Sequence, residues 1–310
     1  MRIAVAYDRA ADEGGTPDTV AVLEAVHATV NALSRADHAA FPIAASAPLE
    51  RFFARLTGVD VVFNLVESLG GRAADEPRVA ALMELTGKPV TGAPSETLAL
   101  CRRKDRVNTL LAAAAVPIPA WTLARPGDAP AWDAFPAIVK PAGEDGSVGI
   151  HEQSIVEDAL ELRAALARSP GDAILQRFVG GRELNVGILG DVVLPVAEIE
   201  FSGAQRLVTY AAKWEAGSAA DLGTRPVCPA RIPEAMADEA RDIARRAWAA
   251  LAGRGYGRVD LRADEDGHLH LLEVNPNPDL APDAGLARMA AAAGCTYDGL
   301  IARILREAQR

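Results

Sequence analysis

The segment around Asp266-Gly267 constrains the fold most strongly, because it reads as two strands joined by a tight turn. Asp-Gly is typical of two-residue hairpin loops. A two-residue turn here places Asp260 opposite Glu273 and Arg258 opposite Asn275. Directly opposed residues share one face of a sheet. We therefore expect these four polar side chains to gather on the same face.

Two carboxylates that face each other destabilise a sheet unless a positive charge lies between them. Asp260, Glu273 and Asn275 offer an all-oxygen set of ligands. Such a set suits Mg²⁺, which takes one or two carboxylates and shares its remaining positions with water and phosphates; Mn²⁺ is an alternative. The other interpretation is an exposed hairpin with solvated charges, and the apolar residues just before Glu273 argue against it.

A second segment has the composition of a phosphate-binding loop. A buried strand over residues 137–140 ends in Lys140, a loop with three glycines follows, and a further strand is expected at 149–151. Backbone amides of such a loop can approach phosphate oxygens while the lysine supplies a point charge. The loop is not a Walker A loop, and no dinucleotide-binding GxGxxG follows a strand. An ordinary β-turn connection is the alternative.

Charge and composition exclude several classes of protein. The 310-residue chain has a net charge of −10, which gives no basic footprint for nucleic acid. No apolar run reaches the roughly 20 residues of a membrane span, and no basic leader precedes an apolar stretch, so we expect a cytoplasmic protein without a membrane partner. Three widely spaced cysteines, Cys101, Cys228 and Cys295, are expected to be free thiols.

The rare lysines are informative in a chain that uses arginine almost everywhere. Only Lys88, Lys104, Lys140 and Lys213 occur beside 28 arginines. A retained lysine indicates a position that needs a compact ammonium rather than a planar guanidinium, although chance retention is the alternative.

The order of predicted elements indicates an α/β (α+β) fold. Strands at 2–7 and 59–64 alternate with helices at 20–33, capped by Thr19, and around 78–86, which favours a parallel α/β layer. After residue 95 we expect one long helix over 96–115 and then short strands separated by glycine and proline. At about 150 residues per domain, the length suggests two domains or three small ones.

Together these features resemble the ATP-grasp superfamily and, within it, the D-alanyl-D-alanine ligase family, over nearly the whole chain. The resemblance implies an ATP-grasp fold with an N-terminal parallel α/β domain (1–95), a small central α+β domain (96–180) and a C-terminal α+β domain that carries the metal site (181–310). Lys88 has no counterpart in the family pattern and is expected at the surface.

The resemblance also assigns roles to residues of this chain. It implies that the ATP-binding residues are Lys104, Lys140, Gly146, Gln176, Phe178, Val179, Glu183 and Lys213. It implies catalytic roles for Arg258, which would stabilise an oxyanion, for Lys213 of a mobile loop and for Ser147. The Mg²⁺ ligands would be Asp260, Glu273 and Asn275.

The chemistry implied by the resemblance has two steps. ATP phosphorylates a substrate carboxylate to an acylphosphate, and an amine then attacks the activated carbonyl, which leaves an amide, ADP and phosphate. The partners would be a small carboxylate and a small amine, and homodimers are frequent in the family.

Both amino-acid pockets depart from the family pattern. Residues 64–76 lack the histidine of the usual HGxxGEDG loop, residues 276–280 read Pro-Asn-Pro-Asp-Leu in place of Thr-Ser-Pro-Gly-Met, Trp214 replaces a tyrosine, and Gly146 replaces a serine. The candidate substrate residues are Asp18, Glu67, Ser68, Arg72, Asn277 and Asp279. Alternatively, Asp18 only begins a helix favourably, and Glu67 and Arg72 face water. The departures leave open a specialised ligase of secondary metabolism that joins other amino acids or amines. A non-catalytic ATP-binding module, a hypothesis from a different class, predicts the loss of a metal ligand or a phosphate lysine, and the sequence shows neither.

Overall fold

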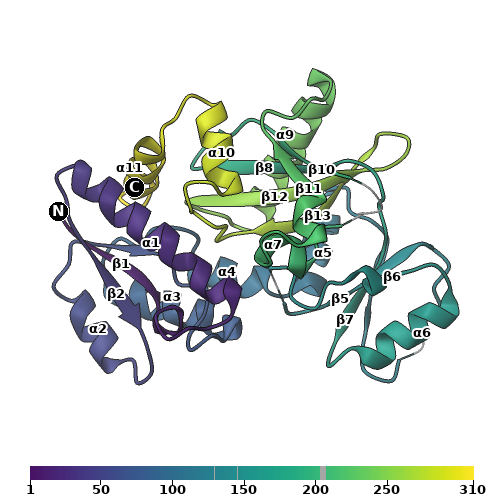
Figure 1. Ribbon diagram of the computed structural model, residues 1–310, viewed down its shortest axis with the longest axis horizontal. Helices are drawn as coiled ribbons and strands as arrows, with labels where there is room; N and C mark the ends of the chain where they lie inside the picture. The colour runs from purple at the N-terminus through teal and green to yellow at the C-terminus, as the bar shows by residue number, and fades with distance from the viewer. Residues whose placement is uncertain (129, 145, 203–206) are drawn as a thin grey trace.

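The computed structural model describes residues 1–128, 130–144, 146–202 and 207–310. Within these ranges the strands form three sheets, which follow one another along the chain. Figure 1 shows the N-terminal layer at the left, the small central sheet at the lower right and the large C-terminal sheet above it. The mixed helices and sheets confirm the predicted α/β (α+β) architecture.

The N-terminal sheet is parallel and has the order β2-β1-β3. Its elements are β1 (Arg2–Asp8), α1 (Pro17–Arg35), β2 (Ala39–Ala45), α2 (Glu50–Leu56), β3 (Val61–Asn64) and α3 (Glu76–Glu84). The predicted start of α1 after Thr19 is wrong. The helix begins at Pro17 with Thr16 as its N-cap, because proline at the first helical position has a suitable φ and needs no hydrogen-bond acceptor.

The predicted long helix over 96–115 is two helices, α4 (Ser95–Cys101) and α5 (Lys104–Ala113). The chain leaves helical geometry at Arg103, with φ −109° and ψ 83°, and the backbone N–H of Lys104 donates to Ala142 O at 3.2 Å. This break places Lys104 at the beginning of α5, beside the glycine-rich loop.

The central sheet has the order β4-β7-β5-β6. Its elements are β4 (Trp121–Ala124), β5 (Ala137–Pro141), β6 (Ile155–Val156), α6 (Ala159–Arg168) and β7 (Ala173–Arg177). The strand expected at 149–151 is absent from the described part of this region. Ser147 and Gly149 have φ values of 64° and 74°, which interrupt an extended backbone and continue the loop.

The C-terminal sheet has the path β11-β10-β8-β12-β13, with β9 paired to β8. Its elements are β8 (Glu183–Leu189), β9 (Val192–Val193), β10 (Ala197–Phe201), α7 (Tyr210–Trp214), α8 (Ala219–Leu222), β11 (Thr224–Val227), α9 (Glu234–Ala250), β12 (Tyr256–Ala263), β13 (Leu269–Asn275), α10 (Gly285–Ala292) and α11 (Tyr297–Glu307).

The turn between β12 and β13 differs from the predicted two-residue loop. Asp264 N–H donates to His268 O at 2.9 Å, which leaves three residues in the loop, and Gly267 has a φ of 86°. A three-residue loop of this kind needs a left-handed residue. The register then shifts between Asp260 and Leu261, so that Leu272 is an extra residue of β13.

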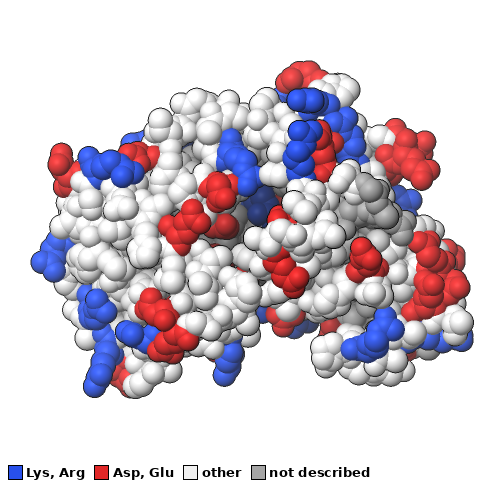
Figure 2. Space-filling model, viewed as in Figure 1, with Lys and Arg blue, Asp and Glu red and all other residues white. Residues whose placement is uncertain are grey.

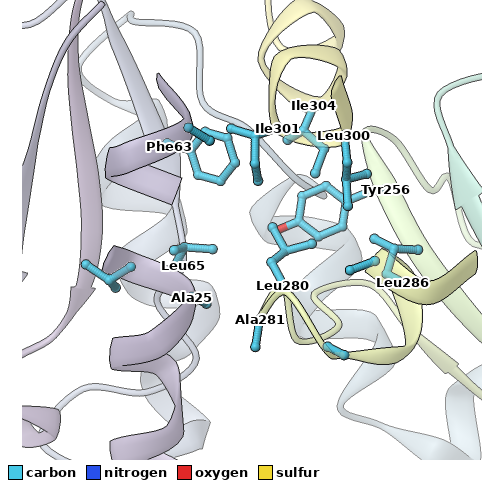
Figure 3. Packing of buried hydrophobic residues seen from close by; sticks show 14 of the residues in the cluster. Ala25, Phe63, Leu65, Tyr256, Leu280, Ala281, Leu286, Leu300, Ile301 and Ile304 are labelled. Atoms are coloured by element: carbon cyan, nitrogen blue, oxygen red, sulfur yellow. The ribbon is translucent and has the colours of Figure 1, made fainter. Parts of the chain in front are cut away.

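A shared core joins the two ends of the chain. In Figure 3, Phe63 and Leu65 of the N-terminal layer approach Tyr256 and Leu280 together with apolar residues of α11. The same interface carries an exposed ion pair between Arg35 and Asp298, with N–O distances of 2.7 and 2.6 Å. Each predicted domain range holds one sheet, and α11 packs on α1. The boundaries at residues 95 and 180 stay a prediction.

Among the described residues, no helix is both long enough and apolar enough to cross a bilayer. The three cysteines are free thiols, as predicted.

Candidate active site

A cavity of about 650 Å³ lies where α1, the central sheet and the C-terminal sheet meet; we refer to it as the central cavity. Figure 2 shows a hollow in the middle of this face, with basic side chains in and around it and acidic side chains beside it. The predicted site residues that line the cavity are Lys104, Lys140, Ser147, Gln176, Phe178, Val179, Glu183, Lys213, Arg258, Asp260, Glu273 and Asp279.

The hairpin presents the predicted cluster in the predicted register, with Asp260 opposite Glu273 and Arg258 opposite Asn275. The extra residue in β13 allows two consecutive side chains, Leu272 and Glu273, to line the central cavity. The alternation of a regular strand would send one of them to the core. The bulge thus adds an apolar wall next to a carboxylate.

Each of the two opposed carboxylates has its own cation. Arg258 donates from Nε and Nη2 to the two oxygens of Asp260 at 2.7 and 2.9 Å, and Lys104 Nζ lies 2.9 Å from Glu273 Oε1. Burial alone raises the pKa of Glu273, yet Lys104, with Lys213 and Lys140 further away, lowers it to about 2. These cations explain how two carboxylates face each other on one sheet.

Asp260 also accepts hydrogen bonds from two side-chain amides, of which the sequence predicted only Asn275. Asn185 Nδ2 on β8 donates to its Oδ1 at 2.8 Å, and Asn275 Nδ2 donates to its Oδ2 at 2.9 Å. Asn185 was not predicted. Asn185 lies on β8 directly opposite Asp260 of β12, and only this strand pairing reveals its role.

The donor set fits a magnesium ion. Asp260, Glu273 and Asn275 present hard oxygens near three lysines. Among the described residues that line the cavity there is no histidine, and Cys228, which follows β11, is the one sulfur-bearing side chain. The charge of Mg²⁺ would neutralise the carboxylates, and the charge of nucleotide phosphates would neutralise the lysines. The assignment of these three residues as its ligands stays a prediction.

Lys140 lies at the end of β5, and its Nζ donates to Gln176 Oε1 on β7 at 2.7 Å. Burial lowers the pKa of Lys140 to about 8, although the negative charge of Glu273 counteracts this effect. A lysine that is poorly solvated and incompletely neutralised is well suited to receive an anionic group.

The glycine-rich loop contacts the segment that carries α7. Ser147 Oγ donates to Val208 O at 3.0 Å, and Trp214 Nε1 donates to Gly146 O at 3.2 Å. Gly146 has a φ of 63°, which glycine adopts without strain. These bonds hold α7 against the glycine-rich loop, and Lys213 of α7 lines the cavity. The role that the resemblance implies for Lys213 stays a prediction. Asp145 of this loop lies outside the described residues.

The predicted nucleotide end contains an arginine that the sequence analysis missed. Arg262 is 3% exposed, donates to Glu183 Oε2 at 2.6 and 3.0 Å, and donates to Val179 O at 3.0 Å. Its guanidinium also lies over the rings of Phe178 and Phe201. Arg262 lies two residues after Asp260 on β12, so both side chains lie on the same face of the sheet, and this spacing could have predicted it.

The candidate substrate residues separate into two groups. Arg72 is exposed and pairs with Asp75 at 3.1 Å, and the Ser68 hydroxyl donates to Asp8 at 2.7 Å, so both side chains are held away from the cavity lining. Asn277 is used structurally: it accepts from Tyr256 Oη at 3.1 Å and donates to Val66 O and Glu76 Oε1. The described lining of the central cavity does not include these three residues, and each has a partner within the protein. Their contact with a substrate stays a prediction.

Asp18, Glu67 and Asp279 remain candidates for substrate contact. Asp18 Oδ1 accepts from Tyr210 Oη at 2.8 Å, which connects α1 to α7 across the cavity. Asp279 lines the cavity, and burial raises its pKa. Burial also raises the pKa of Glu67, to about 8, and the charges of Asp279, Glu76 and Asp18 add to that effect, while Lys213 opposes it.

Comparison with known proteins agrees with this geometry. The family described as D-ala D-ala ligase C-terminus matches residues 121–306. The D-alanine–D-alanine ligase of Gluconobacter oxydans (strain 621H) is 33% identical over 304 residues, which cover 95% of this chain and 97% of that protein. The chain belongs to the D-alanine–D-alanine ligase family. It is therefore an ATP-grasp ligase, and the fold and enzyme class predicted from the sequence are confirmed.

Two further comparisons extend over the same region. The D-alanine–D-alanine ligase of Halorhodospira halophila (strain DSM 244 / SL1) is 35% identical over 266 residues, which cover 85% of this chain and 84% of that protein. The structure of the Bacillus anthracis D-alanine–D-alanine ligase complexed with ATP has a TM-score of 0.80 at 19% identity and covers 100% of this chain and 98% of that chain. At this identity the structural match supports the fold.

Proposed function

We propose that this protein uses ATP to join a small carboxylate to a small amine through an acylphosphate, with release of ADP and phosphate. One observation carries the proposal: Lys104, Lys140 and Lys213 converge on Glu273 in the central cavity, next to Arg258. The converging lysines suit the transfer of a phosphoryl group, and the arginine suits the stabilisation of an oxyanion.

In the proposed reaction, Lys140 and Lys104 bind the nucleotide phosphates, and Lys213 closes over them from α7. Mg²⁺, held by Asp260, Glu273 and Asn275, would neutralise charge on the transferred phosphoryl group. Phe178, Val179 and Leu272 form the apolar wall for the base, and Glu183, oriented by Arg262, accepts hydrogen bonds from the ribose.

Arg258 acts in the second step. Its guanidinium is fixed by both oxygens of Asp260, and the pKa of Arg258 lies above its ordinary value because Asp260 outweighs the effect of burial. A cation held in one orientation stabilises the oxyanion of the tetrahedral intermediate without reorganisation. Ser147 and the backbone of its loop border the same region.

The names of the relatives support D-alanine as one substrate, whereas the altered loops at 64–76 and 276–280 favour a different second substrate. The intact lysines and carboxylates argue against a non-catalytic ATP-binding module. A cytoplasmic location, a homodimer and the use of Mg²⁺ are parts of this proposal that the family relationship favours.

The test is ADP release with ATP and Mg²⁺ against D- and L-amino acids and small amines, singly and in pairs, with mass spectrometry of the products. We expect a new amide whose formation is stoichiometric with ADP. The proposal would be contradicted if no combination of amine and carboxylate increased ADP release above the rate with ATP and Mg²⁺ alone.

A further inference from the structure

The segment that follows β13 is fixed at two points. Asn277 Oδ1 accepts from the Tyr256 hydroxyl at 3.1 Å, and its Nδ2 donates to Val66 O at 3.1 Å. Further along the chain, Leu280 is buried, and its carbonyl oxygen accepts from the Tyr297 hydroxyl at 3.0 Å. Figure 3 shows Leu280 beside Tyr256. The chain between these two anchors is therefore held in one place.

Asp279 lies between the two anchors, and its side chain lines the central cavity. Its Oδ1 accepts from the backbone N–H of Ala281 at 2.8 Å. In the part of the chain that the structure describes, its Oδ2 has neither a hydrogen bond nor an ion pair. A carboxylate with one oxygen held by the backbone keeps acceptor capacity on the other oxygen for a molecule in the cavity.

The strand register brings this segment to the arginine that we assign to the oxyanion. Asn275, where the segment begins, lies opposite Arg258. Tyr256, which holds Asn277, is two residues before Arg258 on β12, so both side chains lie on the same face of the strand. Arg258 and Asp279 line the same cavity, and both N–H donors that orient Arg258 are used by Asp260. Asp279 is thus presented to the reacting centre without being neutralised by the arginine.

The surroundings of Asp279 favour its protonated form more than water does. Burial raises the pKa of the Asp279 carboxyl, and the charges of Asp283 and Glu24 add to that effect, whereas the N–H of Ala281 and the charge of Arg258 oppose it. The other titratable groups that interact with its charge are Glu67, Tyr256 and Tyr297. A raised pKa makes a carboxylate a stronger base.

Asp279 is also a departure from the family pattern. Residues 276–280 read Pro-Asn-Pro-Asp-Leu in place of Thr-Ser-Pro-Gly-Met, so a carboxylate stands where the pattern has glycine. Glycine has no side chain to offer a substrate. The acceptor in the cavity is therefore an addition in this chain.

We propose that Asp279 is a catalytic base, which binds the attacking amine through Oδ2 and accepts a proton from it. The inference rests on the proposed function, because the amine attacks the acylphosphate. The substrate class is a primary amine that is protonated at neutral pH, such as the α-amino group of an amino acid. A carboxylate forms a charge-assisted hydrogen bond with such an ammonium before it accepts the proton.

The proton balance of this step is complete. The ammonium loses one proton to Asp279, and the freed nitrogen pair forms the bond to the carbonyl carbon. The bond between that carbon and the phosphate oxygen then breaks, and phosphate leaves with the electron pair and takes the second proton from the nitrogen. Asp279 returns its proton to water after the products leave.

The test uses a substrate pair that yields an amide in the ADP-release assay, and a second assay in which hydroxylamine replaces the amine. Hydroxylamine is largely unprotonated at neutral pH, so it needs no base before it attacks. We expect Asp279→Asn to reduce amide formation by at least about 100-fold, as the loss of a general base does, and to leave hydroxamate formation unchanged. Asp279→Glu should recover part of the amide formation. Asp37→Asn, which alters an exposed carboxylate after α1, should leave both rates unchanged.

Wild-type rates of amide formation in Asp279→Asn would overturn the inference and leave the ligase proposal standing. Equal losses with both nucleophiles, in Asp279→Asn and in Asp279→Ser, would also overturn it, because they would show a structural role. If no substrate pair yields an amide with the wild-type protein, the ligase proposal fails, and the inference fails with it.

Discussion

Asp260 and Glu273 face each other across the hairpin because two irregularities cancel. The turn contains three residues instead of two, and the extra residue Leu272 in β13 restores the opposition at the site. Arg258 then neutralises Asp260, and Lys104 neutralises Glu273. These two cations allow the two carboxylates to lie close together.

Glu273→Gln should reduce ATP turnover by at least about 100-fold, because it removes a proposed Mg²⁺ ligand and the negative charge that lies near three lysines. The measurement is ADP release over a range of Mg²⁺ concentrations, with part of the loss recovered at high Mg²⁺. Unchanged turnover at ordinary Mg²⁺ would remove Glu273 from the metal site.

Lys140→Met should raise the KM for ATP by about ten-fold or more, because a poorly solvated ammonium next to Gln176 is lost from the phosphate region. Lys88→Met is the matched control, since Lys88 lies in a different cavity that is lined by the 84–94 segment and α9. Steady-state kinetics of both variants provide the comparison. Equal effects of the two substitutions would show that the loss reflects total charge and not the site.

Asn277→Ala should lower the free energy of unfolding by about 1–3 kcal/mol, since it removes the acceptor of the buried Tyr256 hydroxyl and one donor to Glu76. Urea denaturation measures this change, and Asn31→Ala on the exposed side of α1 serves as the control. A stable variant with weakened substrate binding would instead return Asn277 to the substrate residues.

Glu67→Gln should stabilise the protein at alkaline pH. The folded-state pKa of Glu67, about 8, lies above the ordinary value of 4.5. The contribution of Glu67 to the free energy of unfolding is therefore fully present below pH 4.5 and is lost as the pH rises through 8. Glutamine is neutral throughout this range. The difference in free energy of unfolding between Glu67→Gln and the wild type should grow by at most about 1.4 kcal/mol per pH unit over this interval and then level off. Urea midpoints at pH 5 and pH 8.5 measure it, and a constant gap would contradict the assigned pKa.

The sequence predicts those parts of the site that depend on local pattern. The hairpin register places Asp260 opposite Glu273, and the strand before the glycine-rich loop ends in Lys140, as expected. Arg262 and Asn185 were missed because their roles arise from pairing between strands that are distant in sequence.

The internal contacts of the other loop residues have physical causes that a linear sequence does not contain. Asn277 and Ser68 are polar residues in loops, and their type suits a substrate contact as well as an internal hydrogen bond. Only tertiary structure brings Ser68 to Asp8 and Asn277 to Glu76. The break at Arg103 depends likewise on the contact between Lys104 and Ala142.

The most direct test of the central claim is the transfer of oxygen from the carboxylate substrate to inorganic phosphate. The substrate is labelled with ¹⁸O in its carboxylate, and the phosphate released during amide formation is analysed by mass spectrometry. An acylphosphate that is attacked at carbon leaves one labelled oxygen in each phosphate, and the account predicts this result. Amide formation with unlabelled phosphate would contradict it.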